Sequence, residues 1–207
     1  MPSFVQNSFF WNNKYLNNED GWDIGKPTPI FVDYENQLVE NSKILIPGCG
    51  RGYDAIYLSS KGHDVDALDF SSIAIDYLKK TSASKGLVIN TIESNFFTLS
   101  NKYNNTYDYI FEYTFFCAIS PDDRLAYVKK CNDLLKKKGS IIAVFLPLST
   151  QEDSLNPPYQ VKKNHVIKYF KDYFNIEFID KTNKSISPRK NNEFFAVLAK
   201  KWNTSIR

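Results

Sequence analysis

Short apolar segments alternate with helix-forming segments along most of the chain. Strands are expected at residues 43–46, 64–69, 88–93, 107–113 and 140–146. Helices are expected at residues 30–40, 53–61, 71–84, 120–138 and 165–173. Two further strands, 176–180 and 193–200, close the chain around a short loop. This alternation predicts an α/β fold: a doubly wound, mostly parallel sheet covered by helices on both faces, with an antiparallel C-terminal hairpin strand.

Two of the helices begin with capping signals. Ser71 and Ser120 stand at N-cap positions, and Pro121 occupies the first helical position after Ser120. The helix that Ser120 opens is expected to end before Gly139. The three lysines at 136–138 would then lie in its last turn, where cations suit the helix dipole.

The first strand leads into a glycine-rich turn, and the second strand ends on an acid. Gly48, Gly50 and Gly52 alternate as G-x-G-x-G, and Asp69 closes the second strand. Strand, turn, helix, strand and carboxylate together describe the nucleotide half-site of a Rossmann-like fold. The dinucleotide fingerprint has a longer second gap, so this spacing leaves less of a cradle for a pyrophosphate. It favours S-adenosylmethionine over a nicotinamide cofactor.

Asp69 has two interpretations. Its carboxylate can accept hydrogen bonds from both hydroxyls of a ribose, or it can cap the helix that begins after Ser71. The ends of the third and fourth strands, at Ser94, Asn95, Glu112 and Tyr113, belong to the same edge of the predicted sheet and are expected to define the pocket. The Asn95 amide could pair with an adenine edge.

Aromatic residues are concentrated near the N-terminus. Trp11 and Tyr15 are four residues apart, so on a short helix both rings share one face; Trp22 follows in a loop. These rings either cap the core or form a lid over a cationic ligand, because ring faces attract cations. With the glycine turn beside them, we prefer a lid over a sulfonium. Cys117, between Phe116 and Ala118, is expected to be a small buried residue rather than a nucleophile.

Composition narrows the class of protein. The 207 residues, 43% of them hydrophobic, suffice for one domain with a core. A net charge of +3 is too weak to indicate a nucleic-acid partner. Three dispersed cysteines and two histidines indicate neither a disulfide framework nor a metal site. We find no signal-peptide pattern and no apolar run of membrane-spanning length, so we expect a cytoplasmic protein without a membrane partner.

Several separated blocks resemble one known family. The run DYIFEYTFFCAISP at residues 108–121 is similar to the corresponding stretch of the thiopurine S-methyltransferase-like family, especially its plant-type methyl halide, thiocyanate and thiol methyltransferases. Residues 21–23, 28–29, 46–52, 157–159 and 187–190 match further blocks in the same order. The resemblance covers the chain from about residue 11 to residue 200.

The resemblance implies a class I methyltransferase that uses S-adenosylmethionine, releases S-adenosylhomocysteine, needs no metal and methylates a small soft nucleophile: a thiol, sulfide, thiocyanate or halide. A monomer or weak homo-oligomer is expected. Residues 1–207 would form one domain, with an aromatic lid at 1–42 and the Rossmann-like core at 43–207. Alternatives are a methyltransferase for a carboxylate or amine, and a non-catalytic regulator that binds S-adenosylmethionine.

The expected site follows position by position from the resemblance. The cofactor residues would be Trp11, Tyr15, Trp22, Gly48, Gly50, Gly52, Asp69, Phe70, Ser94, Asn95, Phe96 and Tyr113. The acceptor pocket would comprise Trp11, Tyr113, Leu146, Tyr159 and Arg189, whose guanidinium could attract an anion.

The sequence departs from the family pattern at three positions. Tyr15 replaces a tryptophan, Asn95 an aspartate, and Leu146 a tyrosine that many plant halide methyltransferases carry. The last change makes halide a weaker expectation as the natural acceptor.

Residues 156–159 spell Asn-Pro-Pro-Tyr, the tetrapeptide with which methyltransferases of adenine or glutamine amino groups hold a planar base or amide. In those enzymes it follows strand four, whereas here it follows strand five. We therefore expect a loop that lines the acceptor pocket, and no nucleic-acid substrate.

Overall fold

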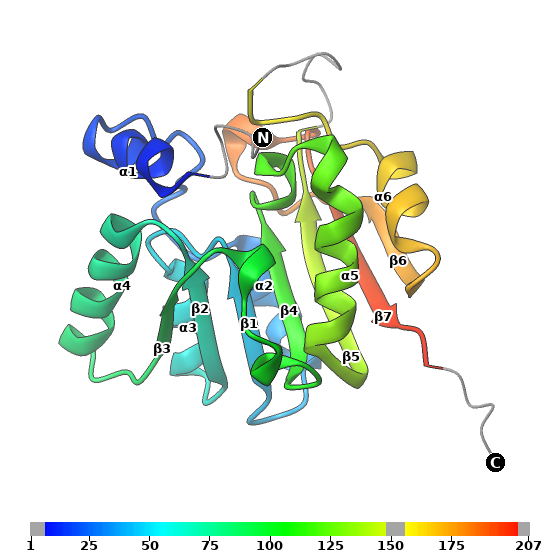
Figure 1. Ribbon diagram of the computed structural model, residues 1–207, viewed down its shortest axis with the longest axis horizontal. Helices are drawn as coiled ribbons and strands as arrows, with labels where there is room; N and C mark the ends of the chain where they lie inside the picture. Colours follow the sequence, from blue (N-terminus) through cyan, green and yellow to red (C-terminus); the bar gives the residue numbers. More distant parts are fainter. Residues whose placement is uncertain (1–6, 148–155, 203–207) are drawn as a thin grey trace.

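The computed structural model describes residues 7–147 and 156–202, and within them seven strands form one sheet (Figure 1). The strand order is β3-β2-β1-β4-β5-β7-β6. The strands are β1 (Lys43–Pro47), β2 (Asp64–Asp69), β3 (Asn90–Glu93), β4 (Tyr107–Tyr113), β5 (Leu135–Phe145), β6 (Phe174–Lys181) and β7 (Phe194–Lys200).

The first five strands are parallel, and β7 runs antiparallel to both of its neighbours, β5 and β6. The predicted fold class is therefore confirmed, including the antiparallel C-terminal hairpin. The register aligns the strand ends that carry the expected site. Pro47 pairs with Leu68, so Gly48 and Asp69 come next on adjacent strands. Asp69 pairs in turn with Glu93, which brings the residues after β3 to the same edge.

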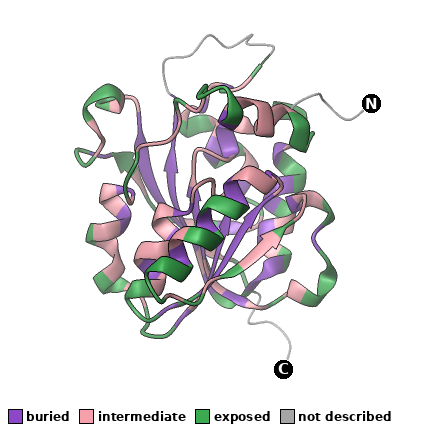
Figure 2. Ribbon diagram, turned by 90° about the vertical axis from the view of Figure 1, so that its left-hand side faces the viewer, coloured by how far each residue is buried: buried purple, intermediate pink, exposed green. Residues whose placement is uncertain are grey.

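Helices cover both faces of the sheet, which is buried between them (Figure 2). The helices are α1 (Ser8–Leu16), α2 (Pro29–Tyr34), α3 (Tyr53–Ser60), α4 (Ser72–Ser84), α5 (Arg124–Leu134) and α6 (Lys163–Phe170). Alternate residues of β1 enter opposite cores, because side chains alternate along a strand. Leu45 packs in the core that α5 and α6 cover, and Ile44 and Ile46 pack in the core with residues of α2, α3 and α4.

Several predicted boundaries are wrong, most clearly around residues 134–139. The helix there ends at Leu134 and β5 begins at once, so Lys136–138 lie exposed on a strand and not at a helix end. Gly139 explains the early strand: a Cβ there would come within 3.0 Å of the carbonyl oxygens of Tyr107 and Asp108. Only a residue without a side chain lets β5 approach β4 this closely.

The two capping signals differ in outcome. Ser71 is the N-cap of α4, and its Oγ accepts a hydrogen bond from the Ala74 amide at 3.3 Å. Ser120 makes no side-chain cap bond; a 3₁₀ turn, Pro121–Asp123, precedes α5. The helix predicted at 30–40 is shorter, because α2 ends at Tyr34 and continues as a 3₁₀ turn, Glu35–Gln37.

The helix α1 lies above the end of the sheet to which the parallel strands point (Figure 1). Its Asn12 side chain bonds to the start of α4: Ser71 Oγ donates to Asn12 Oδ1 at 2.6 Å. Among the described helices, none has the length and apolar character needed to cross a membrane.

Candidate active site

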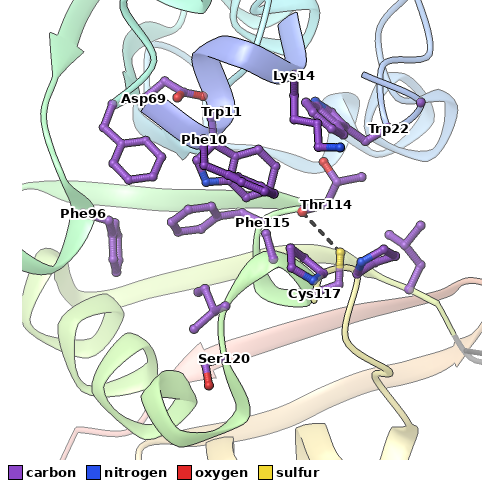
Figure 3. A pocket seen from close by; sticks show the side chains of 18 of the residues that line it. Phe10, Trp11, Lys14, Trp22, Asp69, Phe96, Thr114, Phe115, Cys117 and Ser120 are labelled. Carbon is purple, nitrogen blue, oxygen red and sulfur yellow. Dashed lines mark hydrogen bonds between the residues drawn. The ribbon is translucent and has the colours of Figure 1, made fainter. Parts of the chain in front are cut away.

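A cavity of about 440 Å³ lies at the carboxyl ends of the strands, beneath α1 (Figure 3). Each parallel strand from β1 to β5 contributes the residues that follow it, and the N-terminal segment covers them. This is the edge where open α/β sheets bind ligands. The expected site residues that line the cavity are Trp11, Tyr15, Trp22, Gly48, Asp69, Phe70, Ser94, Asn95, Phe96, Leu146 and Arg189.

The glycine turn forms one wall, and Gly48 is its tightest point. Gly48 has φ +61°, and a Cβ on it would come within 2.5 Å of Phe115 Cδ2. The Phe115 ring lies over the place where any other residue would put its side chain. Because residue 48 has no side chain, a ligand in the cavity beside the Phe115 ring can come close to its backbone.

Gly50 and Gly52 have different surroundings. Gly50 donates its N–H to Asp69 Oδ2 at 3.0 Å and borders a second, small cavity of about 60 Å³ on the other side of the turn. Gly52 lines neither cavity; a Cβ there would come within 2.4 Å of Leu78 Cδ1, so its role is to let α3 and α4 pack closely. The structure does not bring Gly52 to the expected cofactor site.

Asp69 lies where it bonds to backbone amides and also borders the cavity. Its carboxylate accepts the N–H groups of Gly50 and Ser71, the latter at 2.9 Å, and its side chain still lines the cavity. Burial raises its pKa, and the bonds from the Ser71, Gly50 and Phe70 amides oppose that change. Because a carboxylate has about four lone-pair sites, it retains capacity for a hydroxyl donor from the cavity.

The cavity roof consists of aromatic rings from the N-terminal segment. Trp22 meets Trp11 edge to face at 5.3 Å between centroids and Tyr15 at 5.6 Å. Phe10 packs on Trp11 at 5.1 Å. In Figure 3 the rings of Phe10 and Trp11 face Phe115 across the cavity. The prediction that Trp11 and Tyr15 share one helix face is confirmed by α1, on which both residues line the cavity.

The residues after β3 form the side wall next to Asp69. Asn95 is the N-cap of a 3₁₀ turn, and its Oδ1 accepts the Phe97 N–H at 2.8 Å. The side-chain oxygen is thus used locally, which leaves the amide nitrogen as the group that could face a base. Phe96 packs on Phe115 at 5.6 Å and extends the aromatic wall.

Arg189 lines the cavity, but its guanidinium is bound by protein groups. It donates to the Tyr113 hydroxyl and, through Nη2, to the carbonyl of Trp22 at 2.6 Å. Glu193 Oε1 lies 3.9 Å from Nη1 and accepts the Tyr113 hydroxyl at 2.9 Å. These bonds fix the guanidinium at the edge of the cavity, and its attraction for an anionic acceptor stays a prediction.

Two further acceptor candidates lie outside the main cavity. Tyr113 borders the small cavity instead, and Tyr159 is buried, with its N–H donated to the Cys117 carbonyl at 2.7 Å. Pro157 and Pro158 do line the main cavity, beside Leu146. The loop with the Asn-Pro-Pro-Tyr sequence thus contributes prolines to the wall rather than its tyrosine.

Cys117 and Glu112 are the remaining ionisable groups near the turn after β4. The Cys117 thiol lines the cavity and donates to the Thr114 carbonyl at 3.2 Å (Figure 3), and burial raises its pKa to about 12. Glu112 lies behind the wall, where it accepts the N–H groups of Phe115 and Phe116 and the Tyr127 hydroxyl. Burial raises the pKa of Glu112 to about 7. Glu112 organises the turn and does not face the cavity.

The sequence reasoning missed several lining residues, chiefly Phe10, Lys14, Glu19, Thr114 and Phe115. Thr114 and Phe115 directly follow β4, so the rule that strand ends meet at one edge could have included them. Lys14 pairs with Glu19 at 2.6 Å, and no sequence pattern indicated that this pair borders the cavity. Across residues 7–147 and 156–202, no group of three metal-ligating side chains is arranged to hold an ion.

Comparison with known proteins places this site in a family context. The family model described as Thiopurine S-methyltransferase matches residues 6–205. "Probable thiol methyltransferase 2" of Arabidopsis thaliana is 33% identical over 154 residues, which cover 73% of this chain and 66% of that protein. "Thiocyanate methyltransferase 1" of Brassica oleracea is 35% identical over 153 residues, which cover 69% and 64%. These matches span less than two thirds of the plant proteins' own length.

A solved structure supports the fold. Burkholderia thailandensis 1,6-didemethyltoxoflavin-N1-methyltransferase, with bound 1,6-didemethyltoxoflavin and S-adenosylhomocysteine, has a TM-score of 0.75 and 15% identity and covers 95% of this chain and 87% of its own. At this identity the likeness establishes the fold alone, which is that of the class I methyltransferases.

Proposed function

The chain belongs to the thiopurine S-methyltransferase family, and on that premise we propose that it transfers a methyl group from S-adenosylmethionine to a small soft nucleophile. Thiol, sulfide, thiocyanate and halide are the acceptors of this class. The relatives named for thiol and thiocyanate methylation support the proposal.

The residues around the cavity fit the donor. Gly48 leaves the backbone open where a side chain would collide with Phe115, and Gly50, which borders the small cavity, bonds to Asp69 through its N–H. Asp69 can accept from a ribose hydroxyl, and the Ser94–Phe96 wall can border an adenine. Bound S-adenosylmethionine would supply a methyl group on a sulfonium, a cation with a neutral leaving group. The rings of Trp11 and Trp22 can stabilise such a cation through their faces.

The single observation that carries the acceptor class is the state of the ionisable groups along the described lining. Cys117 keeps its proton at neutral pH, Asp69 is bonded to backbone amides, and Lys14 is paired with Glu19. None of these groups is placed as a general base. This lining suits an acceptor that needs no deprotonation by the protein, as halides and thiocyanate do not; a thiol with a pKa of about 8.5 is already partly ionised near neutrality.

The chain's own contribution is then to bind, orient and exclude water. The aromatic roof and the apolar wall at Leu146, Pro157 and Pro158 remove water from an anionic nucleophile, which raises its reactivity. Holding donor and acceptor in line replaces an encounter in solution with a reaction inside one complex.

We extend the proposal to the organisation of the chain: one domain over 1–207, with the lid at 1–42 and the Rossmann-like core at 43–207, acting as a monomer or weak homo-oligomer in the cytoplasm. The position of α1 over the cavity supports the lid assignment.

Two measurements test the proposal. Isothermal titration with S-adenosylmethionine and S-adenosylhomocysteine comes first, and failure to bind either would overturn it. Headspace gas chromatography with sulfide, methanethiol, thiocyanate and iodide comes second, with a carboxylate and an amine as controls. Methylation of a sulfur or halide acceptor is expected. Transfer only to the carboxylate or amine, or tight cofactor binding without any transfer, would contradict the acceptor class.

A further inference from the structure

Arg51 lies in the glycine turn, yet its side chain bonds to the N-terminal segment. Its Nη1 donates to carboxylate oxygens of Asp20 and Asp23, both in the loop after α1. The three side chains are largely buried, with exposed fractions of 23%, 15% and 12%. Exposed ion pairs contribute little, but one guanidinium shared by two shielded carboxylates is held in a defined geometry.

The same guanidinium also packs between two aromatic rings. Its central carbon lies 5.3 Å from the ring centroid of Tyr15 in α1 and 5.5 Å from that of Tyr77 in α4. A planar guanidinium suits such stacking, and a lysine ammonium does not. Arg51 thus connects the glycine turn to α1, to α4 and to the loop at residues 20–23, called the lid loop below.

The lid loop is held from its other side by Arg189. Nη2 of Arg189 donates to the carbonyls of Trp22, at 2.6 Å, and Gly21, at 3.4 Å. The segment 20–23 therefore lies between two guanidinium groups, one bound to its carboxylates and the other to its carbonyls. Trp22 is in the middle of this segment, with its ring against Trp11 and Tyr15 in the cavity roof.

We propose that Arg51 is a positioning residue: through Asp20 and Asp23 it fixes Trp22 over the cavity and ties the aromatic roof to the glycine turn. It touches neither donor nor acceptor in this role and lines neither cavity. The consequence for ligand binding rests on the proposed function, because it assumes that the cavity takes S-adenosylmethionine. A ligand that orders the glycine turn would then also order the roof, since Arg51 belongs to one and holds the other.

The test compares Arg51→Gln, Arg51→Lys and Asp20→Asn/Asp23→Asn with Lys136→Gln. Lys136 pairs with Asp108 at 2.8 Å at the amino ends of the strands, so its variant controls for the loss of a charge pair far from the cavity. All variants carry Trp202→Phe, so that tryptophan fluorescence reports only on Trp11 and Trp22. Three quantities are measured: the dissociation constant for S-adenosylhomocysteine, acrylamide quenching without ligand, and the melting temperature.

We expect Arg51→Gln to weaken S-adenosylhomocysteine binding by about tenfold or more, on the order of one charged contact, and to increase quenching. Its melting temperature should fall further than that of Lys136→Gln, because the substitution leaves two shielded carboxylates without their partner. Arg51→Lys should restore part of the affinity. Combining Arg51→Gln with the double asparagine variant should increase acrylamide quenching no further and weaken S-adenosylhomocysteine binding no further, because all three substitutions break the same contact.

Unchanged quenching in Arg51→Gln, or additive effects on combination with the asparagine substitutions, would overturn the inference. If a variant fails to fold, Arg51→Lys and the single Asp23→Asn provide the same comparison. Failure of the unmutated protein to bind S-adenosylhomocysteine would overturn the proposed function instead. In that case quenching and non-additivity, both measured without ligand, still decide the role of Arg51.

Discussion

Replacing Gly48 with alanine tests whether the glycine turn is shaped by the ring that lies against it. Gly48 has φ +61°, and a new Cβ would lie 2.5 Å from Cδ2 and 2.9 Å from Cγ of Phe115. Phe115 in turn packs against Phe96 at 5.6 Å and Tyr127 at 5.8 Å. The ring therefore cannot move away without disturbing the aromatic wall of the cavity.

Two terms contribute to the cost. A non-glycine residue in the left-handed region lowers the free energy of unfolding by about 1–2 kcal/mol. Forcing a methyl group into a packed site lowers it by about 1–3 kcal/mol more. Gly48→Ala should therefore lower the free energy of unfolding by about 2–5 kcal/mol. Because Phe115 lines the cavity, the affinity for S-adenosylhomocysteine should fall by about tenfold or more, equivalent to at least 1.4 kcal/mol.

Gly86→Ala is the matched control. Gly86 has φ +65°, but nothing lies within 4 Å of its would-be Cβ, so it carries the backbone term without the collision. Urea unfolding and calorimetric titration of both variants separate the two terms. Equal losses of stability in the two variants would refute the reasoning. So would a Gly48→Ala/Phe115→Leu double variant that recovers none of the loss, because the smaller side chain should relieve the collision.

Three further predictions concern ionisable groups in the cavity wall or directly behind it. Asp69→Asn should weaken S-adenosylhomocysteine binding by about tenfold, because its amide nitrogen must face one of the two N–H groups that the carboxylate accepts. Asp66→Asn is the control, because Asp66 lies on the same strand and accepts the Tyr107 hydroxyl at 2.7 Å. This variant should lower the stability of the protein and leave its affinity for S-adenosylhomocysteine unchanged. Cys117→Ala should keep kcat within about threefold, because a thiol with a pKa of about 12 is protonated at neutral pH. The control is Cys131→Ala, since Cys131 is buried in the core. Glu112→Gln should remove a pH dependence of stability. The pKa of Glu112 is about 7 in the folded protein and usually 4.5, so the folded state binds more protons than the unfolded state between these pH values. The free energy of unfolding of the unmutated protein should therefore fall as the pH rises through this range, by about 3 kcal/mol in total.

Each of these has a clear contrary result. Equal affinities for Asp69→Asn and the unmutated protein by titration calorimetry would remove Asp69 from the ligand contacts. A hundredfold or similar loss of kcat in Cys117→Ala alone would make the thiol catalytic. For Glu112, urea unfolding from pH 4 to pH 8 is the measurement; a glutamine variant that loses stability over this range as steeply as the unmutated protein would show that another group titrates.

The parts of the fold that could be predicted are those encoded by short segments. β1, β2 and β4 are short segments with apolar residues at their centres, and their bounds were predicted to within a residue. The boundary between α5 and β5 could not be read, because Lys136–138 have no apolar period and suit a helix end as well as an exposed strand. What decides it is the contact of Gly139 with the carbonyls of β4, a feature that exists only after the sheet has formed.

The candidate site divides in the same way. The donor side follows from local sequence, since Gly48 and Asp69 are brought together by the pairing of two adjacent strands. The acceptor side does not, because its walls come from α1, the turn after β4, the end of β5 and the loops at 157–158 and 189–192. No periodicity connects segments that far apart in the chain.

Arg189 shows why residue type and position in the sequence were insufficient to predict the acceptor side of the cavity. A guanidinium beside a pocket predicts anion binding only if its donors are available, and this depends on partners far away in sequence: Tyr113, Trp22 and Glu193. Those partners make the arginine part of the roof support. Under the proposed function, the apolar wall would then contribute to acceptor binding by desolvation as well. If the proposed function holds, we expect selectivity to depend on how easily each acceptor loses its water, which would favour organic thiols over small, strongly hydrated anions.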